Sequence, residues 1–263
     1  MPLPLKIAIC FSNIQGQVRW QGKRLIDLQE FDEYLRGPVL ERLMDKEYEH
    51  DFASDMRALA TTDMAIDTLQ QLLAFEPKRK PWEVGEALAE SLLKDELGIV
   101  LPWNMERDKR TPRASLPGAD LIGFLKEDEE VFLVLGEVKT SWDKSAPPNV
   151  MSGRSGMIYQ LDRLAVDREI HSTLLKWLNV RCKQEPFQSL YRQAVQKYLN
   201  SQGRDIMLCG LLLRDTNPNE LDLKNRALKL AKNVVAPTRI ELTAWYLPRS
   251  IKKWVEITEG GTR

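Results

Sequence analysis

The sequence is poor in the residues on which histidine- and cysteine-based sites depend. Its 263 residues include two histidines and three cysteines. Cys10, Cys182 and Cys209 lie far apart and are odd in number, so they form neither a metal-binding spacing nor an evident disulfide set. The two histidines are expected to be structural, which disfavours histidine-metal nucleases and Ser-His-Asp hydrolases.

Long apolar runs and phosphate-binding glycine loops are also missing. No segment approaches the roughly 18–20 apolar residues that cross a membrane, and the first residues lack the basic start and apolar stretch of a signal peptide. Neither Gly-x-Gly-x-x-Gly nor a Walker-type lysine loop occurs, so nucleotide-driven work would need a partner. With 43% hydrophobic and 29% charged residues, we expect a globular cytoplasmic protein that has no membrane partner.

The formal net charge is zero, but the charges are unevenly distributed. Residues 1–75 hold 8 Lys/Arg against 12 Asp/Glu, and the remainder holds 30 against 26. We therefore expect an acidic, mostly helical N-terminal lobe at 1–75 and a catalytic α/β core at 76–263. Prolines around charged residues at 76–81 favour a boundary there. The lobe would be a cap over the core or a docking surface for a partner.

Along the lobe, residues 6–11 predict a short strand, and residues 25–44 and 52–75 carry helical spacing. Within the core, residues 157–200 predict two or more helices with a break near Pro186. Strands are expected at 205–213 and 239–247. A helix, a hairpin, further helices and further strands indicate an α/β layer pattern with a mixed sheet.

The most informative feature is a set of charged residues at the ends of two apolar runs. Residues 120–125 and 131–139 predict two strands joined by a charged turn. Because side chains alternate along a strand, Glu137 and Lys139 share a face with the apolar residues before them. A hairpin register that pairs Ile122 with Leu135 also pairs Asp120 with Glu137, whereas a shift by one residue would separate them.

Two neighbouring carboxylates repel each other and raise each other's pKa unless a cation is present. Carboxylate oxygens suit Mg²⁺ or Mn²⁺, which complete their coordination with water and substrate phosphate. A lysine beside such an ion can act on the attacking water or offset phosphate charge. Asp120, Glu137 and Lys139 therefore indicate metal-dependent cleavage of a phosphodiester. The alternative is an ordinary Glu–Lys pair at a solvated strand end.

Asp120 followed by Glu137-Val138-Lys139 resembles the PD-(D/E)XK nuclease superfamily, although Pro117 stands three residues before Asp120. The resemblance implies a restriction-endonuclease-like core, with a mixed central sheet flanked by helices, and Mg²⁺-dependent DNA cleavage in which Mn²⁺ may substitute. It also implies an acid from a preceding helix. In the predicted helix 81–93 we choose Glu86, with Glu90 in reserve; the alternative is a solvated acidic face.

The same resemblance implies a glutamine on the helix after the Glu-x-Lys strand, and Gln160 in the helical pattern 157–164 takes that place. The tyrosine that some members carry four residues later is Leu164 here. Trp142, after the second strand, would stack on a base or pack in the core. Basic residues around the site are expected to contact phosphates: Arg110, Arg113, Arg154 and Arg163.

A closer resemblance involves the effector nuclease of Hachiman-type anti-phage defence. It depends on Gly85-Glu86, Gly118-Ala119-Asp120, Gly136-Glu137-Val138-Lys139, the apolar segment 205–213 and the final 245–248 segment. It implies a helicase or ATPase partner that restrains the nuclease. The sequence thus predicts a metal-dependent DNA endonuclease. The alternatives are a non-catalytic nucleic-acid-binding or assembly subunit on a nuclease fold, and a stand-alone sequence-specific restriction endonuclease.

Overall fold

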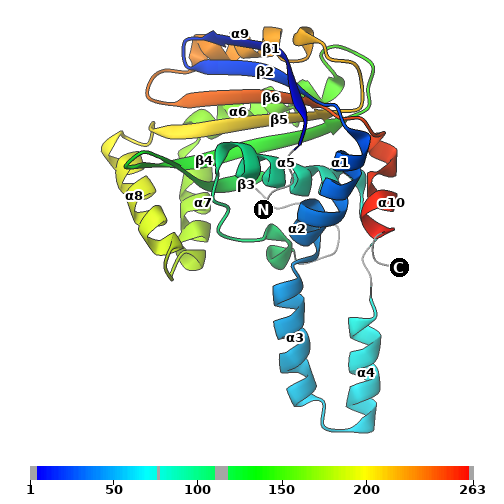
Figure 1. Ribbon diagram of the computed structural model, residues 1–263. Coiled ribbons are helices and arrows are strands. Elements are labelled where there is room, and N and C mark those ends of the chain that lie inside the picture. The colour runs from blue at the N-terminus through cyan, green and yellow to red at the C-terminus, as the bar shows by residue number, and fades with distance from the viewer. Residues whose placement is uncertain (1–4, 76–77, 110–117, 261–263) are drawn as a thin grey trace.

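A computed structural model describes residues 5–75, 78–109 and 118–260. It contains a six-stranded sheet in the order β1-β2-β6-β5-β4-β3 (Figure 1). The strands are β1 (Ile7–Gln15), β2 (Val18–Leu25), β3 (Leu121–Glu127), β4 (Glu130–Ser141), β5 (Ile206–Arg214) and β6 (Arg239–Tyr246). Strands β2, β6, β5 and β4 run parallel, and the two outer strands pair antiparallel to their neighbours. The α/β class with a mixed sheet flanked by helices is confirmed.

Helices cover both faces of this sheet. One face carries α6 (Met157–Val166), α7 (Arg168–Arg181), α8 (Phe187–Asn200) and α9 (Lys224–Asn233). The other carries α1 (Leu28–Tyr34), η1 (Leu35–Val39), α2 (Leu40–Met44), α5 (Pro81–Leu97) and α10 (Trp254–Glu259). The short turns are η2 (Met105–Asp108), η3 (Asn149–Met151), η4 (Glu220–Asp222) and η5 (Ile251–Lys253). The two hydrophobic cores therefore lie on opposite sides of one sheet.

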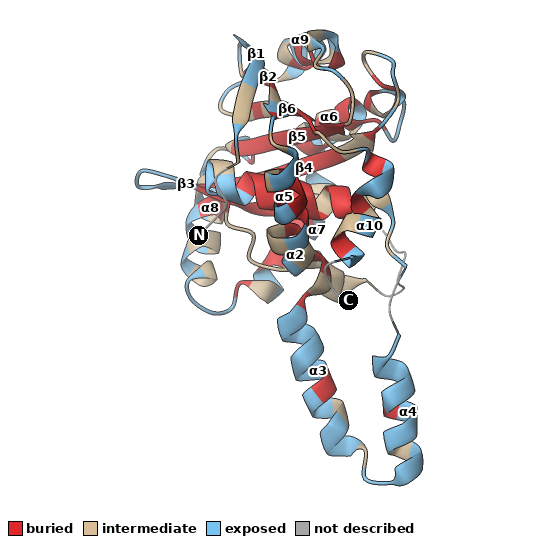
Figure 2. Cartoon of the chain, turned by 45° about the vertical axis from the view of Figure 1, so that its right-hand side comes forward, coloured by how far each residue is buried: buried red, intermediate tan, exposed pale blue. Residues whose placement is uncertain are grey.

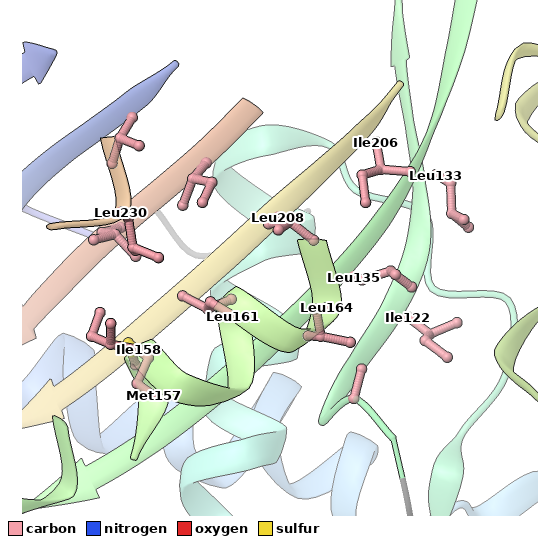
Figure 3. Close-up of a cluster of buried hydrophobic side chains, with 14 of the residues drawn as sticks. Ile122, Leu133, Leu135, Met157, Ile158, Leu161, Leu164, Ile206, Leu208 and Leu230 are labelled. Carbon is pink, nitrogen blue, oxygen red and sulfur yellow. The ribbon is translucent and has the colours of Figure 1, made fainter. Parts of the chain in front are cut away.

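Alternation along β4 explains how one strand serves both cores. Val131, Leu133 and Leu135 are buried against the α6–α9 side, whereas Phe132 and Val134 are buried against the α5 side. Figure 3 shows side chains of helix α6 over those of β3, β4 and β5. Strand β5 is buried along its whole length, as its continuous apolar run predicts.

A glycine on β5 allows helix α6 to lie close to the sheet. A Cβ at Gly210 would lie 2.9 Å from both Met157 Sδ and Leu161 Cδ1, and 2.7 Å from Leu242 Cδ2. We predict that Gly210→Val lowers the free energy of unfolding by about 1–3 kcal/mol because the larger side chain overpacks this contact. Urea unfolding measures the change. Gly37→Ala is the matched control, since no atom lies within 4 Å of its Cβ position.

The N-terminal third does not form a separate lobe, so the expected boundary near residue 76 needs correction. Residues 7–25 form a hairpin that extends the sheet, with β2 parallel to β6. Helices α1 and α2 pack with α5 in the second core. Burial of this hairpin and these helices against the rest of the chain makes them part of one body.

In the described part of the chain, α3 (Lys46–Leu59) and α4 (Asp63–Leu73) project from that body, side by side, as Figures 1 and 2 show. We call residues 46–73 the arm. The chain turns into it at Asp45, which has a left-handed φ of 38° and forms an ion pair with Arg107. Each arm helix buries one residue, Ala53 in α3 and Leu69 in α4. The arm extends away from the sheet, so it does not cap the core.

Candidate active site

The hairpin β3–β4 has the register that the sequence predicts. Leu121 pairs with Gly136, Ile122 with Leu135 and Phe124 with Leu133. The strands extend further into the charged turn than predicted, leaving a turn at Asp128, which adopts a left-handed φ of 51°. Asp120 directly precedes β3 and so lies beside Glu137 of β4.

Three polar groups come together at this end of the hairpin. Lys139 Nζ lies 3.0 Å from Glu137 Oε2 and 3.8 Å from Asp120 Oδ2. The backbone N–H of Val138 donates to Asp120 Oδ2 at 2.8 Å, which fixes the aspartate on the neighbouring strand. Glu137 is 3% exposed. The apolar face of β4 thus ends in two carboxylates and an ammonium group that are partly withdrawn from water.

Burial and neighbouring charges shift the pKa values of Glu137 and Lys139. Burial raises the pKa of Glu137 to about 8, the charge of Asp120 adds to the increase, and Lys139 opposes it. Burial alone would lower the pKa of Lys139, but Asp120 and Glu137 outweigh that effect and raise it above its usual value. Lys139 is therefore a cation at neutral pH. It can donate to a phosphate oxygen.

Glu86, on helix α5, lies close enough to Asp120 and Lys139 for their charges to affect its pKa. This helix begins at Pro81, where the Glu83 carboxylate accepts the backbone N–H of Lys80 at 2.6 Å. Gly85 permits a close approach to β4, because a Cβ there would lie 2.2 Å from Thr140 Oγ1. Burial raises the pKa of Glu86 to about 8, and the charge of Asp120 raises it further. The charges of Asp120 and Lys139 thus act on Glu86, which has no hydrogen-bond partner among the described residues.

Glu90, the reserve choice on the same helix, has a different role. Its carboxylate is buried and forms an ion pair with Arg42, whose guanidinium also donates to the carbonyl of Trp103. This pairing anchors α2 to α5, so Glu90 is a structural acid. The helical spacing alone does not separate Glu86 from Glu90, because the distinction depends on contacts distant in sequence.

The donor set fits Mg²⁺ or Mn²⁺. Mg²⁺ is held in proteins by one or two carboxylates and completes its coordination with water and phosphate oxygens. Asp120 and Glu137 supply two carboxylates from adjoining strand ends, and Glu86 supplies a third nearby. Within residues 5–75, 78–109 and 118–260, no three His, Cys, Asp or Glu side chains already converge as a metal cage. An ion held by Asp120 and Glu137 alone would take the rest of its coordination from water and phosphate oxygens.

Among the residues that the structure describes, Gln160, Arg154 and Arg163 have partners other than the acids or are exposed. The Gln160 side-chain amide donates to the carbonyl of Arg154 at 2.9 Å, on the loop before α6. Arg163 is exposed and forms an ion pair with Asp167 at 2.7 Å, one helical turn away. The Arg154 side chain is exposed, and Arg110 and Arg113 lie outside the described residues. The Gln160 amide thus bonds to the loop before α6 and not to the acids.

A wide cavity lies elsewhere. It has a volume of about 1470 Å³, and its lining includes Glu90 and Trp103 but none of Asp120, Glu137 and Lys139. The Trp103 ring lies between the guanidinium groups of Arg107 and Arg181, at 4.8 and 5.2 Å. These cations are already paired with Asp45 and Asp108. We therefore place the candidate chemistry at the hairpin end, where charged groups converge, and not in this cavity.

The sequence missed one feature of this region and left a second one open. The Val138 N–H that holds Asp120 is a backbone contact with no side-chain signal. Trp142 is 51% exposed, so the expectation that it packs in the core is wrong. Its exposure follows from its position just beyond the end of β4.

No protein-family model, curated protein or solved structure matches this chain. None of the described helices is both long and apolar enough to cross a membrane.

Proposed function

We propose that this chain is a Mg²⁺-dependent nuclease that hydrolyses phosphodiester bonds in DNA. The observation that carries the proposal is the convergence of Asp120, Glu137 and Lys139 at adjoining strand ends, with Lys139 Nζ within 4 Å of both carboxylates. The resemblance of these residues to the PD-(D/E)XK superfamily supports the same activity. Burying charged groups at a strand end costs folding free energy, and such groups are found preferentially at functional sites.

The residues have distinct roles in this proposal. Asp120 and Glu137 hold the ion, and Glu86 contributes a further carboxylate on its helix side. A bound Mg²⁺ would neutralise charge on the scissile phosphate and lower the pKa of a coordinated water. Lys139 donates a hydrogen bond to a phosphate oxygen, and the Val138 N–H keeps the Asp120 carboxylate oriented.

Plasmid cleavage tests the proposal. Supercoiled DNA is incubated with the protein in Mg²⁺, in Mn²⁺ and in chelator, with the double variant Glu137→Ala, Lys139→Ala as control. We expect metal-dependent nicking by the wild type and none by the double variant. Equal cleavage by both proteins would reject this site. A defined fragment ladder would favour a sequence-specific restriction endonuclease, and general degradation would favour a defence effector.

We also propose that the arm is the docking surface for a protein partner. Its exposed apolar side chains are Tyr48, Phe52, Leu59, Met64, Ile66, Leu72 and Leu73. Residues 46–73 hold 6 Asp/Glu and 2 Lys/Arg, whereas the rest of the chain holds 32 and 36. An acidic apolar surface disfavours DNA and favours a protein with basic groups around an apolar groove. The Hachiman resemblance makes a helicase the first partner to test.

Removing the arm is predicted to leave the body folded. Replacing residues 49–72 with a short Gly-Ser linker removes one buried side chain from each helix, and neither contributes to the two sheet cores. We expect a change in melting temperature of only a few degrees, about what a loss of 1 kcal/mol or less produces. Differential scanning calorimetry measures it. Loss of the cooperative transition would show instead that the arm is needed for folding.

A further inference from the structure

One tryptophan differs from the other six in its exposure. Trp142 is 51% exposed, whereas Trp20, Trp245 and Trp254 are at most 4% exposed and the remaining three are half-buried. An aromatic ring of this size gains much from being covered, since it can bury about 150–250 Å². Trp142 follows the last residue of β4 and lies three positions beyond Lys139. It therefore stands at the same end of the sheet as the candidate site.

The surroundings of Trp142 are basic. Lys252 Nζ lies 5.7 Å from the centroid of the indole ring. Lys144, Lys252 and Lys253 are all exposed, and none of the three forms an ion pair with a described residue. The neighbouring carboxylate, Asp143, accepts hydrogen bonds from the N–H groups of Ser145 and Asn149. Asp215, whose carboxylate accepts the N–H of Ile251 beside Lys252, is a second acid nearby, so three lysines face two carboxylates and the local balance is positive.

The chain around the ring is held in place. Ser141 Oγ accepts the N–H of Asp143 at 3.2 Å, and Asn149 Nδ2 donates to Asp143 Oδ2 at 2.9 Å. The buried Arg214 guanidinium donates to the Ser145 carbonyl at 3.1 Å and ties the loop to the end of β5. Because these bonds fix the backbone, the indole is presented to solvent at low cost in conformational entropy.

We propose that Trp142, with Lys144, Lys252 and Lys253, forms a subsite for an unpaired segment of a DNA strand. A base stacks on the indole, and the lysines contact the flanking phosphates. An exposed aromatic ring among unpaired cations is the arrangement that binds single strands with little sequence preference. Three residues of β-strand span about 10 Å, or about three nucleotides at B-form spacing. The subsite therefore lies about 10 Å along the chain from Lys139, beyond the same end of β4. The identity of the ligand rests on the proposed function.

Binding in chelator tests the subsite without cleavage. The probe is a fluorescent 15-nucleotide oligothymidylate, followed by anisotropy at low salt. We expect Trp142→Ala to weaken binding about ten-fold or more, because stacking contributes at this level, and Trp142→Phe to retain most of the affinity. Lys252→Ala should remove one phosphate contact and so reduce the slope of log affinity against log salt by about one. Leu199→Ala, at an exposed apolar position on α8, is the matched control and should leave binding unchanged.

Two further probes separate stacking from charge. The effect of Trp142→Ala should largely disappear on an oligonucleotide with abasic sites and on a blunt duplex, where no unpaired base can stack. Equal binding of oligothymidylate by wild type and Trp142→Ala would overturn the subsite, as would no binding by the wild type. Metal-dependent plasmid cleavage by the same proteins is scored separately. Cleavage without a Trp142 effect on binding rejects the subsite alone, and a Trp142 effect without cleavage rejects the nuclease alone.

Discussion

Replacing Lys139 with methionine is expected to reduce metal-dependent cleavage by at least about 100-fold, the scale on which a positioned donor or acid contributes. The ammonium group lies 3.0 Å from Glu137 and is cationic at neutral pH, so its loss removes the donor to the phosphate. Metal binding should remain, because both carboxylates are kept and a competing cation is gone. Initial cleavage rates at saturating Mn²⁺ measure the effect.

Lys126→Met is the matched control for this change, since Lys126 lies exposed on the same hairpin. It should cleave like the wild type. If Lys139→Met cleaved DNA at the wild-type rate, the lysine would be a structural counter-ion to Glu137 and its catalytic role would be rejected.

Changing Glu86 to glutamine is expected to stabilise the metal-free protein by about 1–3 kcal/mol at pH 8.5. Burial and the charge of Asp120 raise the pKa of Glu86 to about 8, so the ionised form is unfavourable in the folded state. Glutamine keeps the shape without the charge. Urea unfolding in chelator measures the difference in the free energy of unfolding.

The pH dependence of this gain follows from the direction of the shift. Below pH 4.5, the usual value for this carboxyl, Glu86 is protonated in both states and the variant should gain little. Between pH 4.5 and 8 the folded state binds more protons than the unfolded state, so wild-type stability falls as the pH rises. The gain of the variant should therefore grow across this interval and level off above pH 8. Glu129→Gln, at an exposed position, should show no such trend. A gain that is constant with pH would contradict the electrostatic origin.

The hairpin at the site was predictable because its signals are local. Alternating apolar residues and a run of charged residues at the turn define one register, and that register alone places Asp120 beside Glu137. The face shared by Glu137 and Lys139 follows from the two-residue period of a strand. The acidic residues of helix α5 are less informative, because Glu86 and Glu90 lie on the same face of the helix and the sequence does not distinguish their roles. Their separation depends on Arg42, which lies 48 residues from Glu90 in sequence.

The N-terminal strands were largely missed because their stability comes from distant partners. Strand β2 pairs with β6, more than 200 residues later, and has charged residues on its alternate positions. The predicted strand at residues 6–11 corresponds to the first half of β1. The predicted helix at 52–75 is divided by a break between Leu59 and Asp63 into the two helices of the arm. No periodic pattern in the sequence predicts that the arm projects from the body, because this depends on the tertiary structure.

Loop positions were the least predictable. For Trp142 the sequence leaves stacking and core packing open, and the choice depends on the path of the chain beyond β4, where Asp143 and Arg214 bond to the following loop. The resemblance to the nuclease superfamily predicts Gln160 as a site residue, but its side-chain amide donates to the Arg154 carbonyl in the loop before α6. In both cases a backbone arrangement outside any helix or strand decides where the side chain points.

We propose that Asp120 and Glu137 hold a divalent ion. Titration with Mn²⁺, followed by electron paramagnetic resonance, tests this most directly. The control is the double variant Glu127→Gln, Glu130→Gln, a pair at the opposite end of the same hairpin. We predict that the wild type and this control bind Mn²⁺ alike, and that Asp120→Asn, Glu137→Gln does not bind it. Equal Mn²⁺ binding by all three proteins would contradict the claim.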